Sequence, residues 1–173
     1  ARDLLIASVL SPAPVIYIDD RWLYDQEDEL PPIVEQNLAM LGPQVLRRGD
    51  DITLVASGYS TRIALEAGRQ LHAGRFGAEV IDLRVLNPFN PELITQSVRR
   101  TGRLLVIDGG WSACGMAGEV IASVVERLPP DALKKPPARI TLPSAPAPTS
   151  RALESAYYPT VGMAVARAKG LLE

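Results

Sequence analysis

The residues of this chain best suited to chemistry are its one histidine and its one cysteine. His72 lies in QLHAGR, at the end of an expected surface helix, and no motif supplies the carboxylate or nucleophile that a catalytic histidine needs. Cys114 lies in GGWSACGMAGE, before an expected helix start, where backbone N–H groups can lower a thiol pKa. Without a histidine near it in sequence, we interpret Cys114 as a packed loop residue and His72 as a solvated helix end.

A glycine-rich stretch around Cys114 is the next candidate, because such stretches can cradle a phosphate at a helix start. Its glycines follow the order GG-x-x-x-x-G-x-x-G, whereas a dinucleotide site needs G-x-G-x-x-G, and no lysine follows in the P-loop position. The structural interpretation is that Gly109-Gly110 turns the chain sharply and that Gly118 lets a helix approach the sheet. A small anion-binding α/β module stays open as a second function.

Large aromatic side chains are rare here, at 5% of the residues, and three of them stand next to expected turns: Trp111, Tyr157 and Tyr158. Aromatic residues at the ends of elements serve either as core plugs or as contact anchors between proteins. The sequence does not choose between these two roles.

Composition excludes several classes of partner. The 173 residues are 47% hydrophobic, enough for a full core, and carry a formal net charge of -2 with both signs mixed. Without a basic field we expect neither nucleic acid nor a membrane surface as a partner. The apolar runs are too short to span a bilayer, one histidine rules out a His-rich metal cluster, and one cysteine fits a reducing cytoplasm.

The N-terminal part lacks a core of its own. Residues 3–10 have helical spacing, and residues 14–18 (PVIYI) form an apolar, β-branched run that predicts a buried strand. Residues 25–32 (DQEDELPP) are acidic and proline-bounded, which is typical of an exposed connector. Carboxylates can bind divalent cations, but in such a stretch they are more often solvated; the acids are Asp19, Asp20, Glu27, Asp28 and Glu29.

From residue 43 onward, apolar strands alternate with amphipathic helices. We expect strands at residues 44–47, 52–56, 78–83, 104–107 and 139–142. We expect helices at 92–100, 116–128 and 150–172, the last interrupted near Pro159, and a further helix with the buried stripe Ile63, Ala64, Ala67 and Leu71. This alternation predicts a three-layer α/β sandwich with a mostly parallel sheet of about five strands, in which residues 44–47 form an antiparallel edge strand.

The same segments carry a resemblance to a known family. PVIYIDDRWLY, GDDITLVASGYSTRIALEAGRQL, GAEVIDLRVLNPFNPELITQSVRRTGRLLVIDGGW and PAPTSRALESAYYP follow one another in family order. Together they resemble the beta subunit of the decarboxylase component of 2-oxo-acid dehydrogenase complexes. The resemblance implies a transketolase C-terminal-like domain at residues 43–173, a linker at 25–42, and the end of a pyrimidine-binding domain at 1–24.

The resemblance also implies how the work is divided in the parent enzyme. The glutamate that activates thiamine diphosphate would lie in the absent part of the pyrimidine-binding domain, and the alpha subunit would hold diphosphate and magnesium. We therefore expect no catalytic residue and no cofactor-binding residue in this chain. We expect an assembly and oligomerisation domain, inactive alone, whose parent enzyme oxidatively decarboxylates a 2-oxo acid and transfers the acyl group to lipoyl.

Partners and a cation site follow from the same resemblance. The partners would be an alpha subunit, a second beta subunit in a homodimer contact, and the dihydrolipoyl acyltransferase core. A monovalent cation would bind backbone carbonyls of Ser8, Ser11 and Ala13, although Ser11 and Ala13 stand where the family usually has Asp and Asn. WSACGMAG and PAPTS depart from the commoner family forms, so a transketolase-like enzyme fragment acting on sugars or diketones stays open.

Overall fold

The computed structural model describes residues 1–27 and 29–173, which form two compact units, Ala1–Gly42 and Pro43–Glu173. No helix among these described residues is long and apolar enough to cross a membrane.

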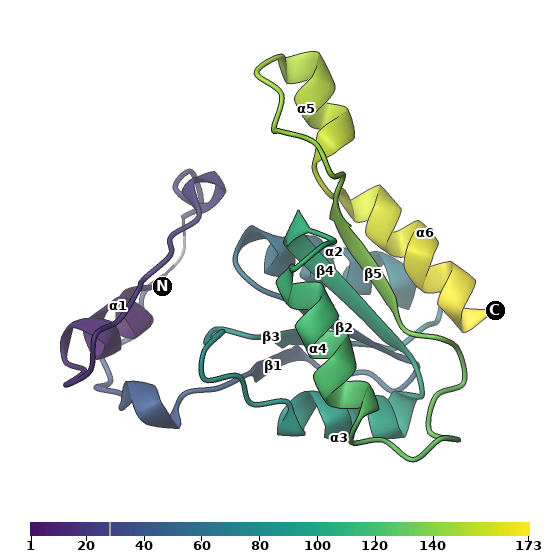
Figure 1. The fold of residues 1–173 in the computed structure, drawn as a ribbon, viewed down its shortest axis with the longest axis horizontal. Coiled ribbons are helices and arrows are strands. Elements are labelled where there is room, and N and C mark those ends of the chain that lie inside the picture. Colours follow the sequence, from purple (N-terminus) through teal and green to yellow (C-terminus); the bar gives the residue numbers. More distant parts are fainter. Residues whose placement is uncertain (28) are drawn as a thin grey trace. The chain divides into compact units, whose positions relative to one another are not determined.

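The larger unit is built on a sheet with the strand order β1-β3-β2-β4-β5 (Figure 1). β2 pairs in parallel with β3 and β4, β5 pairs in parallel with β4, and β1 joins β3 antiparallel. The strands are β1 Gln44–Arg47, β2 Ile52–Ala56, β3 Ala78–Asp82, β4 Leu104–Trp111 and β5 Ala138–Leu142. The predicted fold, a mostly parallel sheet with one antiparallel edge strand, is confirmed.

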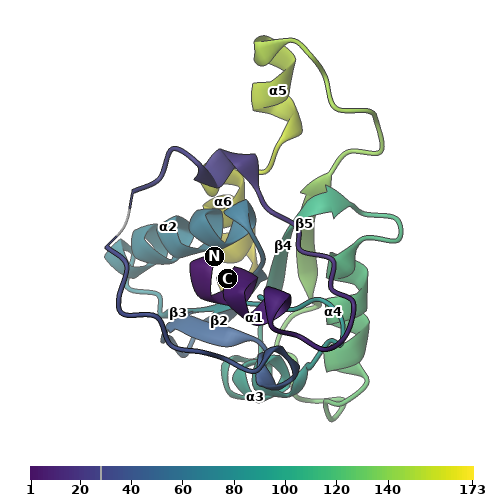
Figure 2. The same ribbon diagram turned by 90° about the vertical axis from the view of Figure 1, so that its left-hand side faces the viewer.

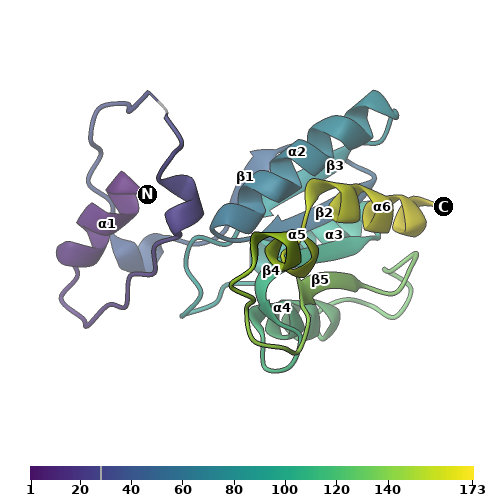
Figure 3. The same ribbon diagram turned by 90° about the horizontal axis from the view of Figure 1, so that it is seen from above.

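Helices cover both faces of this sheet (Figures 2 and 3). α2 (Tyr59–Ala73) and α6 (Val161–Leu172) pack on one face, and α3 (Glu92–Thr101) and α4 (Met116–Val125) pack on the other. Side chains alternate along each strand, so Leu54 joins the core under α2 and α6, whereas its neighbour Val55 joins the core under α3 and α4. This double burial explains why the strands are apolar on both faces.

The ends of α3 match the signals in its sequence. Pro91 precedes the first residue, where its missing N–H costs no hydrogen bond. Gly102 follows the last residue with φ 73°, a left-handed conformation that glycine adopts without strain, and its N–H bonds the carbonyl of Val98. The expected break near Pro159 is also present, between α5 (Arg151–Tyr157) and α6.

The expected ends of β4 and α4 were wrong. β4 does not end at Gly109-Gly110 but runs through both glycines, because its pairing with β5 resumes at Trp111 opposite Leu142. The sharp turn falls at residues 112–115 instead. α4 ends at Val125 rather than at residue 128, because the amides of Arg127 and Leu128 bond carbonyls three residues back, which tightens the chain out of the α-helix.

Polar side chains buried under α3 are mutually bonded. Thr53 Oγ1 lies 2.7 Å from Ser97 Oγ and 2.8 Å from Thr101 Oγ1. On β3, Glu79 is only 1% exposed, and it accepts from the Arg100 guanidinium at 2.7 Å and pairs with that of Arg48 at 3.4 Å. Each buried group on this face therefore has the partner that burial requires.

The smaller unit contains the predicted N-terminal helix, α1 (Arg2–Val9), and two short 3-10 helices, Arg21–Leu23 and Leu38–Met40. The predicted buried strand at residues 14–18 was wrong: the segment is irregular, with Ile16 90% and Ile18 78% exposed. A strand is stable only beside another strand, and the described residues offer none here. Residues 25–27 and 29–32 are exposed, as expected, whereas Asp28 lies outside the described residues.

Candidate functional site at the carboxyl edge of the sheet

The carboxyl ends of β2, β3 and β4 meet at one edge of the sheet. After β2 the chain continues to β3 on one side, and after β3 it returns to β4 on the other side of β2. The loops after β2 and β4 therefore flank a point where the strand order reverses. In open α/β sheets, ligands bind outside the strand ends at such a point.

Asp108 dominates the loop after β4. Its carboxylate is 7% exposed, and it accepts the amide of Gly110 at 2.8 Å and the amide of Ala117 at 2.9 Å. Ala117 is in the first turn of α4, so an internal carboxylate occupies the position that an external anion would take at this helix start. The amides of the glycine-rich stretch already donate to Asp108, which argues against this stretch as a binding site for an external anion.

Asp82 ends β3 on the same edge. Its Oδ1 accepts the hydroxyl of Thr61 at 3.2 Å and the amide of Arg84 at 3.3 Å. Burial raises the pKa of the Asp82 carboxyl above its ordinary value, against the opposing effect of these hydrogen bonds. The Asp82 carboxyl therefore holds its proton to a higher pH than an exposed aspartate does.

An aromatic cluster of Trp111, Tyr157 and Tyr158 lies where β4 meets the end of α5. Trp111 Nε1 donates to Tyr157 Oη at 3.2 Å, and Tyr157 Oη donates to the carbonyl of Ala145 at 2.6 Å. The rings of Tyr157 and Tyr158 pack edge to face, with their centroids 5.0 Å apart. Tyr157 is buried, which fits a core plug, whereas Trp111 is 54% exposed.

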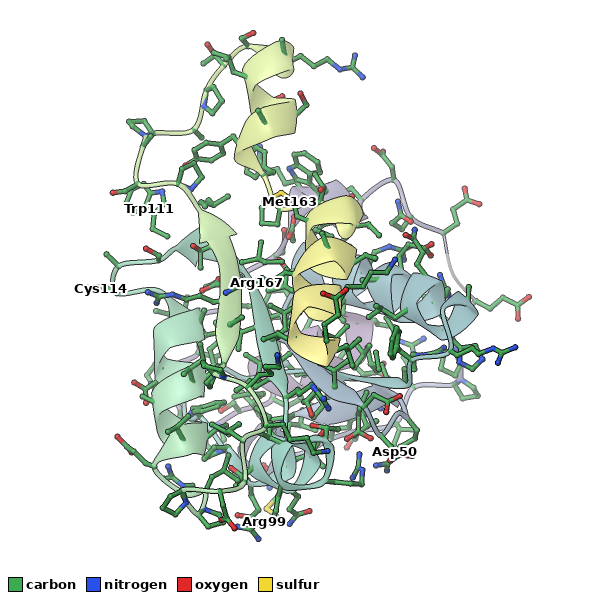
Figure 4. All side chains as sticks on the ribbon, turned by 90° about the vertical axis from the view of Figure 1, so that its right-hand side faces the viewer. Asp50, Arg99, Trp111, Cys114, Met163 and Arg167 are labelled. Atoms are coloured by element: carbon green, nitrogen blue, oxygen red, sulfur yellow. The ribbon has the colours of Figure 1, made fainter. Side chains whose placement is uncertain are left out.

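Figure 4 shows Trp111 and Cys114 at the end of the larger unit from which α5 projects, opposite Asp50 and Arg99. Cys114 is exposed, with φ 55°, in the loop after β4. His72 is in the last turn of α2, a helix that begins at the carboxyl edge and ends about 20 Å away, since each residue adds about 1.5 Å. The fold thus separates the only thiol from the only imidazole.

The three residues considered for a cation are in the smaller unit. Ser8 is in α1, and its carbonyl accepts the amide of Ser11 at 3.4 Å. Ser11 Oγ accepts the amide of Ala13 at 3.2 Å. Among the described residues, no group of three or more His, Cys, Asp or Glu side chains is arranged to hold a metal ion. Carbonyl ligands at Ser8, Ser11 and Ala13 stay a prediction.

The sequence analysis missed Asp82 and Asp108. A signal was present, since both follow an apolar run, in EVIDL and LVIDGG, at the carboxyl end of an expected parallel strand. Such positions point to the edge where ligands bind. Their hydrogen-bond partners, Thr61 and Ala117, come from elements that only the folded chain brings to them.

The sheet order and the antiparallel edge strand define a three-layer α/β domain of the transketolase C-terminal type. Residues 43–162 match the family model "Transketolase, C-terminal domain". The chain belongs to this family.

Relatives of known function are similar over most of this chain. The beta subunit of the mitochondrial pyruvate dehydrogenase E1 component of Caenorhabditis elegans is 35% identical over 165 residues, 92% of this chain and 46% of that protein. The beta subunit of acetoin:2,6-dichlorophenolindophenol oxidoreductase of Bacillus subtilis is 36% identical over 161 residues, with the same two coverages. This chain therefore spans about half the length of these relatives.

Two solved structures share the fold. A split-gene transketolase, an inactive beta4 tetramer, has a TM-score of 0.66 and 30% identity, over 75% of this chain and 42% of that chain. A 2-oxoglutarate:ferredoxin oxidoreductase from Magnetococcus marinus has a TM-score of 0.53 at 13% identity, which supports the fold alone.

Proposed function

We propose that this chain is the carboxyl-terminal assembly domain of the beta subunit of a thiamine-dependent 2-oxo-acid dehydrogenase. The observation that carries the proposal is the match of 92% of this chain to the beta subunit of a pyruvate dehydrogenase E1 component. The parent enzyme would decarboxylate a 2-oxo acid oxidatively and pass the acyl group to a lipoyl carrier. Its alpha subunit, a second beta subunit and an acyltransferase core would be the partners.

The two buried acids of the larger unit do not fit a thiamine site. Activation of thiamine needs a glutamate that is free to exchange a proton with the aminopyrimidine ring. The two acids described as buried, Glu79 and Asp108, are held by Arg100 and by the amide of Ala117, respectively. The proposal therefore assigns no step of the reaction to this chain.

The split-gene transketolase gives the assembly role a precedent. In that protein the similar chain forms a tetramer of beta subunits that is inactive. We infer that the present chain likewise associates with copies of itself and needs a further subunit for activity. The exposed face of Trp111, together with α5 and α6, would supply the contact.

A second candidate rests on the same neighbour. Because the split-gene protein is a transketolase, the parent enzyme could instead act on sugars or diketones. The two candidates are distinguished in the enzyme assembled with its partner subunit. Reduction of a dye by pyruvate or a branched-chain 2-oxo acid supports the dehydrogenase, and ketol transfer between sugar phosphates supports the transketolase.

Self-association is tested by light scattering on the purified chain over a range of concentrations. We expect a dimer or larger species, and we expect Trp111→Ala to weaken it by at least tenfold, since an exposed tryptophan is a common anchor of interfaces. Trp22→Ala is the matched control, because Trp22 is 52% exposed in the smaller unit. A monomer at every concentration would overturn the assembly role.

Cofactor binding is tested by calorimetry with thiamine diphosphate and magnesium. We expect no saturable heat with the chain alone. Saturation at micromolar concentration would show that this chain itself carries a cofactor site, which would contradict the proposal that other parts of the parent enzyme bind the cofactor. The result of the self-association test would not be affected.

A cation site at Ser8, Ser11 and Ala13 belongs to the same proposal. The Ser8 carbonyl already accepts a hydrogen bond from one amide, and the remaining ligands of the cation would lie in the parent enzyme. We therefore expect potassium to leave the thermal midpoint of this chain unchanged relative to sodium. A potassium-specific rise would mean that these carbonyls suffice on their own.

A further inference from the structure

A β-bulge in the edge strand β1 redirects one arginine. In the pairing of β1 with β3, Val45 is opposite Ile81 and Arg47 is opposite Val80, so Leu46 is one residue too many. Val45 and Arg47 would normally point to the same face of the sheet, but a bulge reverses the alternation. Val45 packs with the core under α3 and α4, whereas Arg47 lies against α2.

Gly68 on α2 makes room for this arginine. A Cβ atom at Gly68 would lie 3.2 Å from Cδ of Arg47 and 3.3 Å from Cγ2 of Val80. The stem of the Arg47 side chain therefore fills the space that a larger residue on the helix would occupy. The bulge and the glycine together place the side chain of Arg47 against α2.

Arg47 has no counter-charge among the described residues. Its Nε is buried without an acceptor, and its guanidinium makes no hydrogen bond or ion pair within residues 1–27 and 29–173. A buried donor that lacks an acceptor is rare in folded proteins.

The acids near β1 are already engaged. Asp50 and Glu79 both pair with Arg100, and Asp51 accepts the amide of Gly77 at 2.6 Å. None of these three acids is therefore left to accept a hydrogen bond from Arg47.

We propose that β1 docks an extended acidic segment of a partner protein, which adds a strand to the sheet and places a carboxylate on Arg47. β1 is the last strand in the sheet order, so its outer backbone groups are available for pairing. Leu46, 41% exposed, offers an apolar contact beside the arginine. A free anion would gain little from one guanidinium at a surface, whereas a strand adds a row of main-chain hydrogen bonds.

The test is a titration of the isotope-labelled chain followed by amide NMR. The probe is an eight-residue capped peptide of alternating threonine and valine with one central glutamate and a lysine at each end. Its twin carries glutamine in place of glutamate. We expect shifts confined to β1 and its neighbours, and binding of the glutamate peptide at least tenfold tighter than binding of the glutamine peptide.

Variants of the chain distinguish specific docking of the peptide at Arg47 from general attraction between opposite charges. Arg47→Gln should abolish the preference for glutamate, whereas Arg48→Gln should keep it, because Arg48 is the adjacent arginine and its side chain is 77% exposed. Gly68→Ala should reduce the preference by displacing the stem of Arg47, and it provides a second variant that alters no charge.

The proposal would be overturned by equal binding of the two peptides, by no shift at millimolar peptide, or by shifts at β1 on dilution without peptide. The last result would assign this edge to a second copy of the chain. A shift of the Arg47 resonances by inorganic phosphate equal to that by the glutamate peptide would likewise contradict a strand and indicate a simple anion site.

Discussion

At the scale of single residues, the carboxyl edge of the sheet shows how similar side chains acquire different roles. Asp82 and Asp108 both follow apolar strands. Asp108 accepts two amides through different oxygens, whereas Asp82 receives both of its hydrogen bonds on Oδ1, and burial raises the pKa of the Asp82 carboxyl. The elements around each acid, and not the residue type, therefore decide its hydrogen-bond partners.

Asp82 gives a pH-dependent prediction. Burial raises the pKa of the Asp82 carboxyl in the folded chain, so as the pH rises this carboxyl ionises in the unfolded chain first. The free energy of unfolding therefore falls with rising pH until the carboxyl of the folded chain ionises too. Asp82→Asn keeps an acceptor for both donors and removes this loss. We expect the unfolding free energy of the variant, relative to the parent chain, to improve from about pH 3 to about pH 7.

Urea unfolding at several pH values measures that difference. Ser57→Ala at the same edge is a control without a titrating group and should give a constant difference. A relative stability of Asp82→Asn that worsens as the pH rises would mean that the charged carboxylate is the stabilised form.

Gly115 gives a steric prediction. A Cβ atom there would overlap the carbonyl oxygen of Trp111, a backbone atom that cannot move without distorting β4. We expect Gly115→Ala to lower the unfolding free energy by about 1–3 kcal/mol. Gly118→Ala is the matched control. A Cβ atom there meets only the flexible Arg139 guanidinium, at 3.4 Å, and alanine favours the helix by about 1 kcal/mol.

Thermal and urea unfolding of these two variants test the assignment of the close contact. Equal effects of the two substitutions would contradict it. Gly118 was predicted to let the helix approach the sheet, and a Cβ atom there would meet only Arg139 of β5, whereas the tight backbone contact is at Gly115, in the turn after β4.

At the scale of elements, the buried hydroxyl cluster of Thr53, Ser97 and Thr101 connects β2 to α3 by hydrogen bonds. Thr53 lies within hydrogen-bond distance of both Ser97 and Thr101 inside an otherwise apolar interface. Apolar packing brings a helix onto a sheet, but it allows the helix to slide. A pair of directional bonds at one position fixes where α3 lies along β2.

Thr53→Val tests this tie, since valine keeps the shape of threonine and removes the hydroxyl. We expect a loss of about 1–3 kcal/mol in unfolding free energy, because the buried hydroxyl of Ser97 loses its hydrogen bond with the hydroxyl of residue 53. Urea unfolding followed by circular dichroism measures it. The same change at exposed Thr149 should have little effect, and equal effects at both positions would argue against a structural role for the cluster.

At the scale of the whole molecule, the two units differ in how they are stabilised. Both core clusters draw only on residues of the larger unit, from Val45 to Leu172. In the described part of the smaller unit only Ala7 is buried, and large apolar side chains such as Val9, Ile16 and Met40 are mostly exposed. Apolar surface of this kind is typical of a segment that another chain or domain covers.

A shortened chain tests this difference. We expect Pro43–Glu173 to unfold cooperatively, with an unfolding free energy within about 1 kcal/mol of that of the full chain, since the cores are retained. We also expect it to be more soluble, because exposed apolar side chains are removed. Loss of cooperative unfolding in the shortened chain would show that residues 1–42 contribute to the core.

The local pattern of the sequence was sufficient to predict the alternation of strands and helices, the edge strand at residues 44–47 and the family. The alternation and the edge strand depend on periodicity and on proline and glycine signals, which act within a few residues, whereas the family was predicted from the resemblance of whole motifs. The same approach failed at residues 14–18, because a strand also needs a neighbour that lies outside the segment.

Only the tertiary structure could decide which polar groups have partners. Glu79 and Arg100 are 21 residues apart, Trp111 and Tyr157 are 46 residues apart, and in each pair the contact depends on the packing of two elements. The bulge that turns Arg47 toward α2 likewise arises from its pairing with β3. Local pattern determined what each segment becomes, and long-range packing determined which side chains are satisfied and which are left for a partner.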